Sequence, residues 1–175
     1  MPVAPEIRIS NARDIDAIVS MYPLAFPDED LVPVVRQLLA EPELALSLVA
    51  IVDDQVVGHV IFTTCAVEGS DLRSSLLAPL AVAPGFQRQG IGSEIVKAGL
   101  QRLIDSGVEV AFVLGDPAYY SRFGFVPDSK VQPPYPLPAE WYTAWQSQYL
   151  GDASRSYAGK LAVPSQWLDP ALWAP

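Results

Sequence analysis

Gln87-Arg88-Gln89-Gly90-Ile91-Gly92-Ser93 is the stretch of sequence that decides the fold. An apolar run, residues 76–86, precedes it, and a pattern typical of an amphipathic helix follows it. Gly90 and Gly92 carry no Cβ, so a ligand can approach the backbone closely where the chain turns into the helix. Amide groups at the start of a helix lack intrahelical partners and attract anions. We therefore expect a strand, loop and helix that bind a phosphate-bearing cofactor.

Two side chains of this loop suit the same kind of ligand. Arg88 can add a charged contact at the rim of the loop, and the hydroxyl of Ser93 can donate to a phosphate. A tight turn between strand and helix would also explain the two glycines, so the prediction depends on the flanking elements. Other phosphate loops fit poorly, because the sequence lacks the Gly-Lys-Ser/Thr of a P-loop and the three-glycine dinucleotide fingerprint.

The composition limits the class of protein. With 175 residues, half of them apolar, we expect one domain over 1–175. A net charge of −9 with only 11 Lys and Arg argues against nucleic acid as a partner. The longest apolar run falls short of the roughly 18 residues that a membrane span needs. The N-terminal residues do not resemble a signal peptide, and a single cysteine, Cys65, fits a reducing compartment, so we expect a cytoplasmic protein. One histidine and one cysteine leave no His/Cys cluster for zinc, so we expect no metal site.

Hydrophobic periodicity predicts alternating strands and helices in the N-terminal half. We expect a strand at 7–9, then a helix that starts at a capping box in 11–14 and ends at Pro23, and a second helix over 31–39. Strands over 44–52 and 55–67 are expected to be joined by a hairpin turn at Asp53-Asp54, and a further strand is expected over 76–82.

The C-terminal half continues with a helix from residue 91 that Gly107 closes. We expect a strand over 109–114, a short helix capped by Asp116 that runs through Phe123, a strand starting at 124–126 and a late strand over 157–163. Aromatic residues between 141 and 149 have helical spacing and predict a helix before Gly151. Residues 128–175 are expected to complete the same domain.

Two motifs together resemble a known family. Leu80-Ala-Val-Ala-Pro-Gly-Phe86, followed by Gln87-x-x-Gly90-x-Gly92, resembles motif A of the Gcn5-related N-acetyltransferases (GNAT). Tyr120-Ser-Arg-Phe-Gly-Phe125 is similar to the element that follows the fifth strand in that family, and residues 113–120 look closer still to the bacterial YhbS-like branch. The resemblance covers about residues 6–127. It implies an α/β, layered α+β fold whose mixed, mostly antiparallel sheet is flanked by helices and has splayed parallel fourth and fifth strands.

The same resemblance implies a function: transfer of an acetyl group from acetyl-CoA to a primary amine by direct attack. It implies that Tyr120 is the general acid that protonates the departing thiolate. The residues implied to bind the cofactor are Leu80, Ala81, Val82, Gln87, Arg88, Gln89, Gly90, Ile91, Gly92, Ser93 and Phe123.

Several alternatives stay open at this point. A non-catalytic acyl-CoA-binding sensor would use the same loop, and Tyr120 would then only pack its helix against the sheet. Glu68 and Asp71 are candidate bases, although solvation explains both. His59, inside an apolar strand, is better explained as a structural histidine, and Cys65 lacks a histidine partner for nucleophilic catalysis. The late aromatic residues suit core packing, a homodimer contact or an acceptor pocket.

Overall fold

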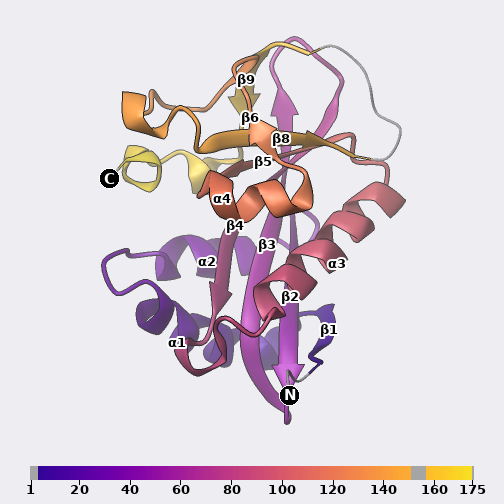
Figure 1. Ribbon diagram of the computed structural model, residues 1–175, viewed down its shortest axis with the longest axis vertical. Coiled ribbons are helices and arrows are strands. Elements are labelled where there is room, and N and C mark those ends of the chain that lie inside the picture. The colour runs from indigo at the N-terminus through magenta and orange to yellow at the C-terminus, as the bar shows by residue number, and fades with distance from the viewer. Residues whose placement is uncertain (1–3, 151–156, 175) are drawn as a thin grey trace. The chain divides into compact units, whose positions relative to one another are not determined.

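The computed structural model describes residues 4–150 and 157–174, which Figure 1 shows as a ribbon. They divide into two compact units. The first contains the chain up to residue 63 together with 78–102, and the second contains 64–77 together with the chain from 103. Three elements continue from one unit into the other: β3 (Gln55–Val67), β4 (Arg73–Val82) and α3 (Ile91–Asp105). None of the helices in the described residues is long and apolar enough to cross a membrane.

The strands of the first unit lie in the order β1-β2-β3-β4. β1 (Glu6–Ile9) and β2 (Ala45–Val52) are antiparallel, and so are β2 and β3. Asp53 and Asp54, which join β2 to β3, have φ angles of 50° and 61°. A two-residue hairpin turn of this kind needs positive φ at both central residues. The predicted hairpin is therefore confirmed.

Helices cover both faces of this part of the sheet. α1 (Ile15–Ala25) contacts β3 through Tyr22, whose hydroxyl hydrogen-bonds His59. α3 contacts the neighbouring residue of the strand, since a Cβ placed on Gly58 would lie 3.2 Å from Cγ2 of Ile91. Successive strand residues point to opposite faces. α1 and α3 therefore lie on opposite faces, as Figure 1 shows, and α2 (Val32–Leu39) packs beside α1.

The start of α1 follows the sequence prediction, but its end does not. Asn11 forms the predicted capping box with Asp14, which caps a 3₁₀ turn over Ala12–Asp14 that leads straight into α1. The expected stop at Pro23 was wrong, because α1 continues to Ala25. A proline removes one amide donor from a helix. The next turn still closes here, since the N–H of Phe26 donates to the carbonyl of Tyr22 at 2.8 Å.

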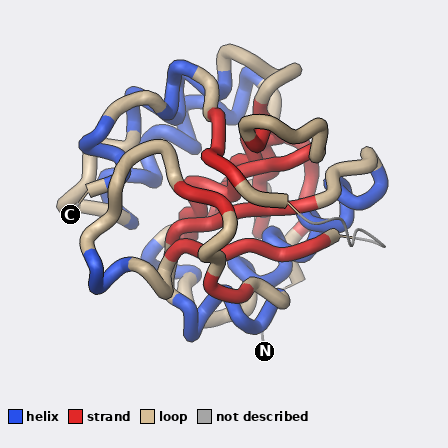
Figure 2. Tube along the Cα trace, turned by 90° about the horizontal axis from the view of Figure 1, so that it is seen from above, coloured by secondary structure: helices blue, strands red, loops and turns tan. Residues whose placement is uncertain are grey.

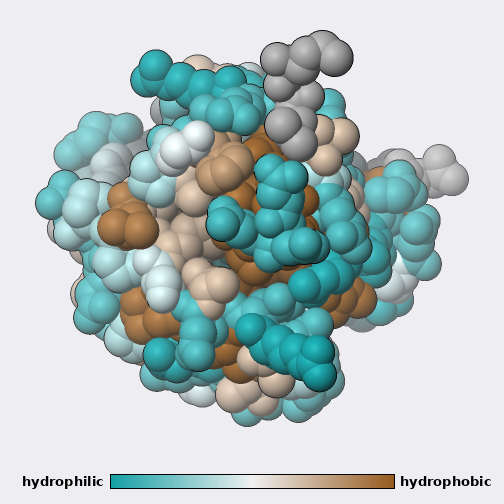
Figure 3. Space-filling model, turned by 90° about the horizontal axis from the view of Figure 1, so that it is seen from below, coloured by the Kyte–Doolittle hydropathy of each residue, from teal (hydrophilic) through white to brown (hydrophobic). Residues whose placement is uncertain are grey.

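Polar residues dominate the exposed positions between these elements. Figure 3 shows one face of the molecule, on which hydrophilic residues surround smaller brown areas of hydrophobic ones. Among the large hydrophobic side chains of the first unit, Ile9 and Leu24 are exposed. The buried side chains of this unit instead come from the strands and from the inner sides of the helices, so its core lies between the sheet and its helices.

The second unit holds the mixed part of the sheet, with its strands drawn in red in Figure 2. Its strands beyond β3 and β4 are β5 (Val110–Leu114), β6 (Val126–Pro127), β7 (Val131–Gln132), β8 (Trp145–Tyr149) and β9 (Gly159–Ala162). β4 pairs with β5 in parallel through Ser74–Leu76, and β7 pairs with β9 in parallel. β8 is antiparallel to both β5 and β6, and β9 is antiparallel to β3. The mixed, mostly antiparallel sheet with a parallel β4–β5 pair is thus confirmed.

The segment with aromatic residues at helical spacing forms a strand instead. Residues 139–141 make a short 3₁₀ turn, and β8 begins at Trp145, opposite Leu114 of β5. The helix predicted before Gly151 was therefore wrong. Aromatic side chains fit a pleated surface well. In a strand, side chains alternate between the two faces of the sheet. In β8, Trp145 and Ser147 therefore lie on one face and Gln146 lies on the other.

Aromatic rings build the core of the second unit. Trp145 stacks on Phe112 with centroids 5.5 Å apart, and Trp173 meets Trp145 edge-on at 5.9 Å. Trp167 in turn packs against Trp173 at 6.2 Å. All four rings are buried. Of the three roles open to the late aromatic residues, core packing accounts for these tryptophans.

Candidate functional site

The glycine loop connects a 3₁₀ turn (Pro84–Phe86) to the start of α3. Its two glutamines are tied back to the chain before it. Nε2 of Gln87 donates to the carbonyl of Val82 at 3.0 Å, and Nε2 of Gln89 donates to that of Gly85 at 3.4 Å. Gln87 thereby ties the loop to the end of β4, and Gln89 ties it to the 3₁₀ turn. Gln87 and Gln89 therefore shape the site, a role that the sequence alone did not distinguish from ligand binding.

Gly90 lies at the exposed corner where the loop enters α3. Its φ of 84° belongs to the left-handed region, and a Cβ placed on it would meet no other atom within 4 Å. Steric crowding by the protein therefore does not require a glycine here. The conformation favours glycine, and the space beside it is open to an approaching ligand.

The first turn of α3 presents its amide groups at this corner. The carbonyl of Gly90 accepts the bond from Glu94 N at 3.0 Å, so the amides of residues 91–93 precede the first helical hydrogen bonds. The side chain of Ile91 is buried against Gly58, which leaves only its backbone for a ligand. Gly92 and Ser93 are half-buried, and Arg88 is exposed with φ of 63°. Together with the helix dipole, this arrangement suits an anion.

The end of β4 lies directly beside the loop. Ala81 is buried, while Leu80 and Val82 are half-buried. The strand keeps its pairing with β3 as far as Ala83, whose N–H donates to the carbonyl of Val57 at 2.8 Å. Through the bond from Gln87 to Val82, the structure brings the predicted residues 80–82 and 87–93 together in the first unit.

The predicted catalytic residue Tyr120 belongs to the second unit and lies on α4 (Pro117–Tyr120). Asp116 caps this helix, because its Oδ1 accepts from Ala118 N at 2.9 Å. The prediction that Asp116 is a cap is therefore confirmed. A 3₁₀ turn, Ser121–Phe123, follows and ends at Gly124, which has φ of 99°. This short element places Tyr120 just beyond the end of β5.

Aromatic neighbours and a glycine fix the ring of Tyr120. It meets Phe125 edge-on at 5.9 Å and Tyr119 at 5.0 Å, and it is tilted against Phe123 at 6.2 Å. A Cβ on Gly115 would lie only 2.4 Å from Cε2 of Tyr120, so the ring occupies the space that a side chain at 115 would take. Burial, and to a smaller extent Tyr119, raises the pKa of Tyr120 above its ordinary value. The phenol therefore stays protonated at neutral pH.

Gln146 supports this position from β8, which sequence reasoning missed. The side chain is fully buried, and its Nε2 donates to the carbonyl of Gly115 at 3.1 Å and to that of Ala144 at 3.4 Å. The N–H of Gly115 also donates to Ala144, at 3.0 Å. Gln146 thus holds the backbone against which Tyr120 packs. A lone glutamine in an unremarkable strand carries no sequence signal of this role.

The other titratable candidates do not form a second reactive centre. His59 is fully buried between Tyr22, 2.6 Å from its Nδ1, and Ser47, 2.8 Å from its Nε2. Burial lowers the pKa of His59 to about 3, so it is neutral, as expected of a structural histidine. Burial raises the pKa of Cys65 to about 12. Glu68 is exposed, and within 4–150 and 157–174 no group of three His, Cys, Asp or Glu could hold a metal ion.

A family model agrees with these features. The model for the acetyltransferase (GNAT) domain matches residues 6–127. Two Escherichia coli proteins named as uncharacterized N-acetyltransferases are also similar. YjhQ is 35% identical over 150 residues, which are 81% of this chain and 82% of YjhQ. YhbS is 38% identical over 120 residues, which are 68% of this chain and 72% of YhbS.

Solved structures show the same architecture. The crystal structure of E. coli YhbS in complex with CoA has a TM-score of 0.86 and 30% identity, covering 95% of this chain and 93% of YhbS. A GNAT family acetyltransferase from Brucella melitensis in complex with acetyl-CoA has a TM-score of 0.74 and 28% identity, covering 93% of this chain and 97% of that protein. Both complexes hold a ligand that carries phosphate groups, which is the kind of ligand that the loop geometry suits.

Proposed function

The chain belongs to the GNAT acetyltransferase family, and from this premise we propose that it transfers an acetyl group from acetyl-CoA to a primary amine. The observation that carries the proposal is the corner at Gly90, where open space meets the amides that begin α3. The related YhbS and Brucella proteins were solved with CoA and acetyl-CoA, which supports the same ligand here.

In this proposal the backbone amides of residues 88–93 hold the pyrophosphate of the donor. Arg88 adds a charged contact at the exposed rim, and Ser93 adds a hydroxyl. The backbone at Leu80–Val82 pairs with the pantetheine arm. Val82 already uses its carbonyl to accept from Gln87, so we assign the arm to the groups of Leu80 and Ala81.

The chemical step is direct attack of the amine nitrogen on the thioester carbon. A C–N bond forms, the C–S bond breaks, the nitrogen loses a proton and the CoA sulfur gains one. We assign the donor of that proton to the Tyr120 hydroxyl. The Tyr120 phenol is protonated at neutral pH, and its first contribution is a hydrogen bond to the charge that develops on sulfur. Because burial raises the pKa of Tyr120, it is a weaker acid than a free phenol, and the phenolate left after it protonates the thiolate takes a proton back from water.

A route through an acetylated cysteine is disfavoured. The nucleophile in such a route is a thiolate. Burial raises the pKa of Cys65 to about 12, so its thiol stays protonated at neutral pH. His59, held between Tyr22 and Ser47 with its pKa lowered to about 3, is not available as an activating base. Direct transfer therefore fits the described residues better.

Release of free CoA over a panel of primary amines tests the activity. We expect acceptor-dependent release from acetyl-CoA, which a non-catalytic sensor would not show. Tight acetyl-CoA binding without such release by any amine would overturn the enzymatic proposal.

The matched pair Tyr120→Phe and Tyr119→Phe tests the acid. Tyr119 is the adjacent phenol, and its ring keeps its contact with Arg122, 4.5 Å from the centroid, in the phenylalanine variant. We expect Tyr120→Phe to lower kcat by about a hundredfold while leaving CoA affinity unchanged, and Tyr119→Phe to change kcat little. An unchanged kcat in Tyr120→Phe would remove the acid assignment but not the transferase activity.

A further inference from the structure

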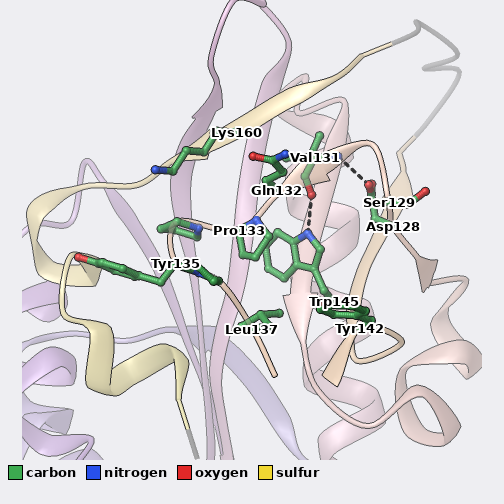
Figure 4. Close-up of a pocket in the computed structure, with 12 residues that line it drawn as sticks. Asp128, Ser129, Val131, Gln132, Pro133, Tyr135, Leu137, Tyr142, Trp145 and Lys160 are labelled. Carbon is green, nitrogen blue, oxygen red and sulfur yellow. Dashed lines mark hydrogen bonds between the residues drawn. The ribbon is translucent and has the colours of Figure 1, made fainter. Parts of the chain in front are cut away.

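A hollow of about 530 Å³ opens in the second unit beside β7 and the proline-rich segment 133–138 (Figure 4). Small-molecule sites commonly have volumes of roughly 300–1,000 Å³. Its walls are apolar: Pro133 and Leu137 are half-buried, and Pro134 and the ring of Trp145, which also line it, are buried. The indole Nε1 of Trp145 donates its hydrogen bond to the carbonyl of Val131 at 2.7 Å and is therefore not available to a ligand. The walls therefore offer flat apolar surface to a ligand.

This pocket lies on the opposite face of β8 from the Tyr120 site. Trp145 lines the pocket, while the next residue, Gln146, hydrogen-bonds Gly115, against which Tyr120 packs. Consecutive residues of a strand point to opposite faces. The acetyl-transfer chemistry assigned to Tyr120 thus leaves this pocket without a role.

The acidic residue of the pocket is not available to a ligand. Oδ1 of Asp128 accepts from the N–H groups of Lys130 and Val131 at 2.7 and 2.9 Å. Oδ2 accepts from the hydroxyls of Ser147 at 2.5 Å and Tyr157 at 3.3 Å. A carboxylate offers about four acceptor positions, and all four are taken here. A cationic ligand would find no free acceptor on Asp128.

The rim instead provides donors. Lys160 of β9 and Gln132 of β7 are paired in register, so their side chains are neighbours, and both are exposed. Figure 4 shows them on the same side of the pocket, near Pro133. The Lys160 ammonium points away from the Gln132 amide in Figure 4, but its long flexible stem lets both groups donate to the two oxygens of one carboxylate.

An exposed ring completes the mouth of the pocket. Tyr142 lines it with 64% of its surface exposed. A second ring stacked there would remove apolar surface from water.

We infer that this pocket binds a small aromatic carboxylate, with its ring against Pro133, Leu137 and the exposed ring of Tyr142 and its carboxylate on Lys160 and Gln132. The observations favour an anion over a cation. The carboxylate of Asp128 already accepts hydrogen bonds from its own neighbours, so it neither binds a cation nor neutralises the donors at the rim. This site is independent of the proposed acetyl transfer.

Calorimetric titration with indole-3-acetate and its neutral amide, indole-3-acetamide, tests the inference. We expect the acid to bind saturably and about tenfold more tightly than the amide, because only the acid makes a charge-assisted contact. Lys160→Gln should reduce the affinity for the acid to that for the amide. Lys130→Gln is the matched control, since Lys130 lies 5.9 Å from the ring of Tyr157 and does not line this pocket.

Three results would overturn the inference: no saturable binding of either probe to the folded protein, equal affinities for acid and amide, or an acid affinity that Lys160→Gln leaves unchanged. Tyr142→Ala should weaken both probes, and circular dichroism should show each variant folded. Titration of the same samples with CoA reports separately on the donor site, so failure of one proposal is distinguishable from failure of the other.

Discussion

Replacing Gly90 with alanine separates the conformational cost of the loop from the cost to ligand binding. The φ of 84° is unfavourable for a residue with a Cβ, by about 1–2 kcal/mol. The protein itself adds no clash, because nothing lies within 4 Å of the new Cβ. For a chain of 175 residues this corresponds to a fall of roughly 2–8 °C in melting temperature.

Gly69 provides the control for this cost. It lies in the turn between β3 and β4, has a φ of 78°, and its Cβ would also meet nothing within 4 Å. Gly69→Ala should therefore lose a similar amount of stability. Only Gly90→Ala should also lose affinity for CoA, by at least about tenfold, because its Cβ stands where the pyrophosphate approaches the amides.

Thermal unfolding of the wild type and the two variants measures the loss of stability. Calorimetric titration with CoA, at a temperature where all three proteins are folded, measures the loss of affinity. Wild-type CoA affinity in Gly90→Ala would refute the placement of the pyrophosphate at this corner. An equal loss of affinity in Gly69→Ala would show instead that general destabilisation weakens binding.

Three further predictions concern single residues. Gly115→Ala should push the ring of Tyr120 aside, since the new Cβ would lie 2.4 Å from it, and we expect lower kcat with unchanged CoA affinity; unchanged kcat would contradict this. Because the pKa of His59 is about 3 in the folded protein and about 6.5 in the unfolded chain, its contribution to stability is present above pH 6.5 and is lost as the pH falls toward 3. Between pH 7 and 5 the loss is about 2 kcal/mol, which urea unfolding should show in the wild type and not in His59→Gln; equal pH dependence in both would be contrary evidence. Cys65, whose pKa burial raises to about 12, should resist iodoacetamide in the folded protein and react after unfolding, as mass spectrometry can show; rapid labelling of the folded protein would contradict its burial.

Local sequence signals predicted much of the first unit. Asp53-Asp54 and the capping box at Asn11 specify their structures through backbone geometry that neighbouring residues alone determine. Pro23 was misjudged because one missing donor near the end of a helix does not prevent the next turn from closing. The strand from Trp145 was missed because its pairing with β5 brings together residues between 31 (Leu114 and Trp145) and 39 (Val110 and Tyr149) positions apart, which no local pattern reveals.

The candidate site divides in the same way. The Gly90 corner was predictable because its chemistry resides in the backbone of a contiguous stretch. Gln146 was not, since its role depends on reaching the carbonyl of Gly115 at the end of the neighbouring strand β5, which lies far away in the sequence. The motif also predicted Gln87 and Gln89 as binding residues, which stays a prediction; the structure adds that both side chains hydrogen-bond the chain before the loop.

The passage of β3, β4 and α3 through both units has a consequence for how such a protein can diversify. No single break in the coding sequence yields either unit whole. A fragment starting at residue 103 lacks Ser74–Leu76, which pair with β5, and Ala66–Val67, which pair with β9. Recombination at one junction would therefore disrupt a sheet rather than exchange a module. New specificity is expected to arise by point substitution and by changes in loop length within an intact gene.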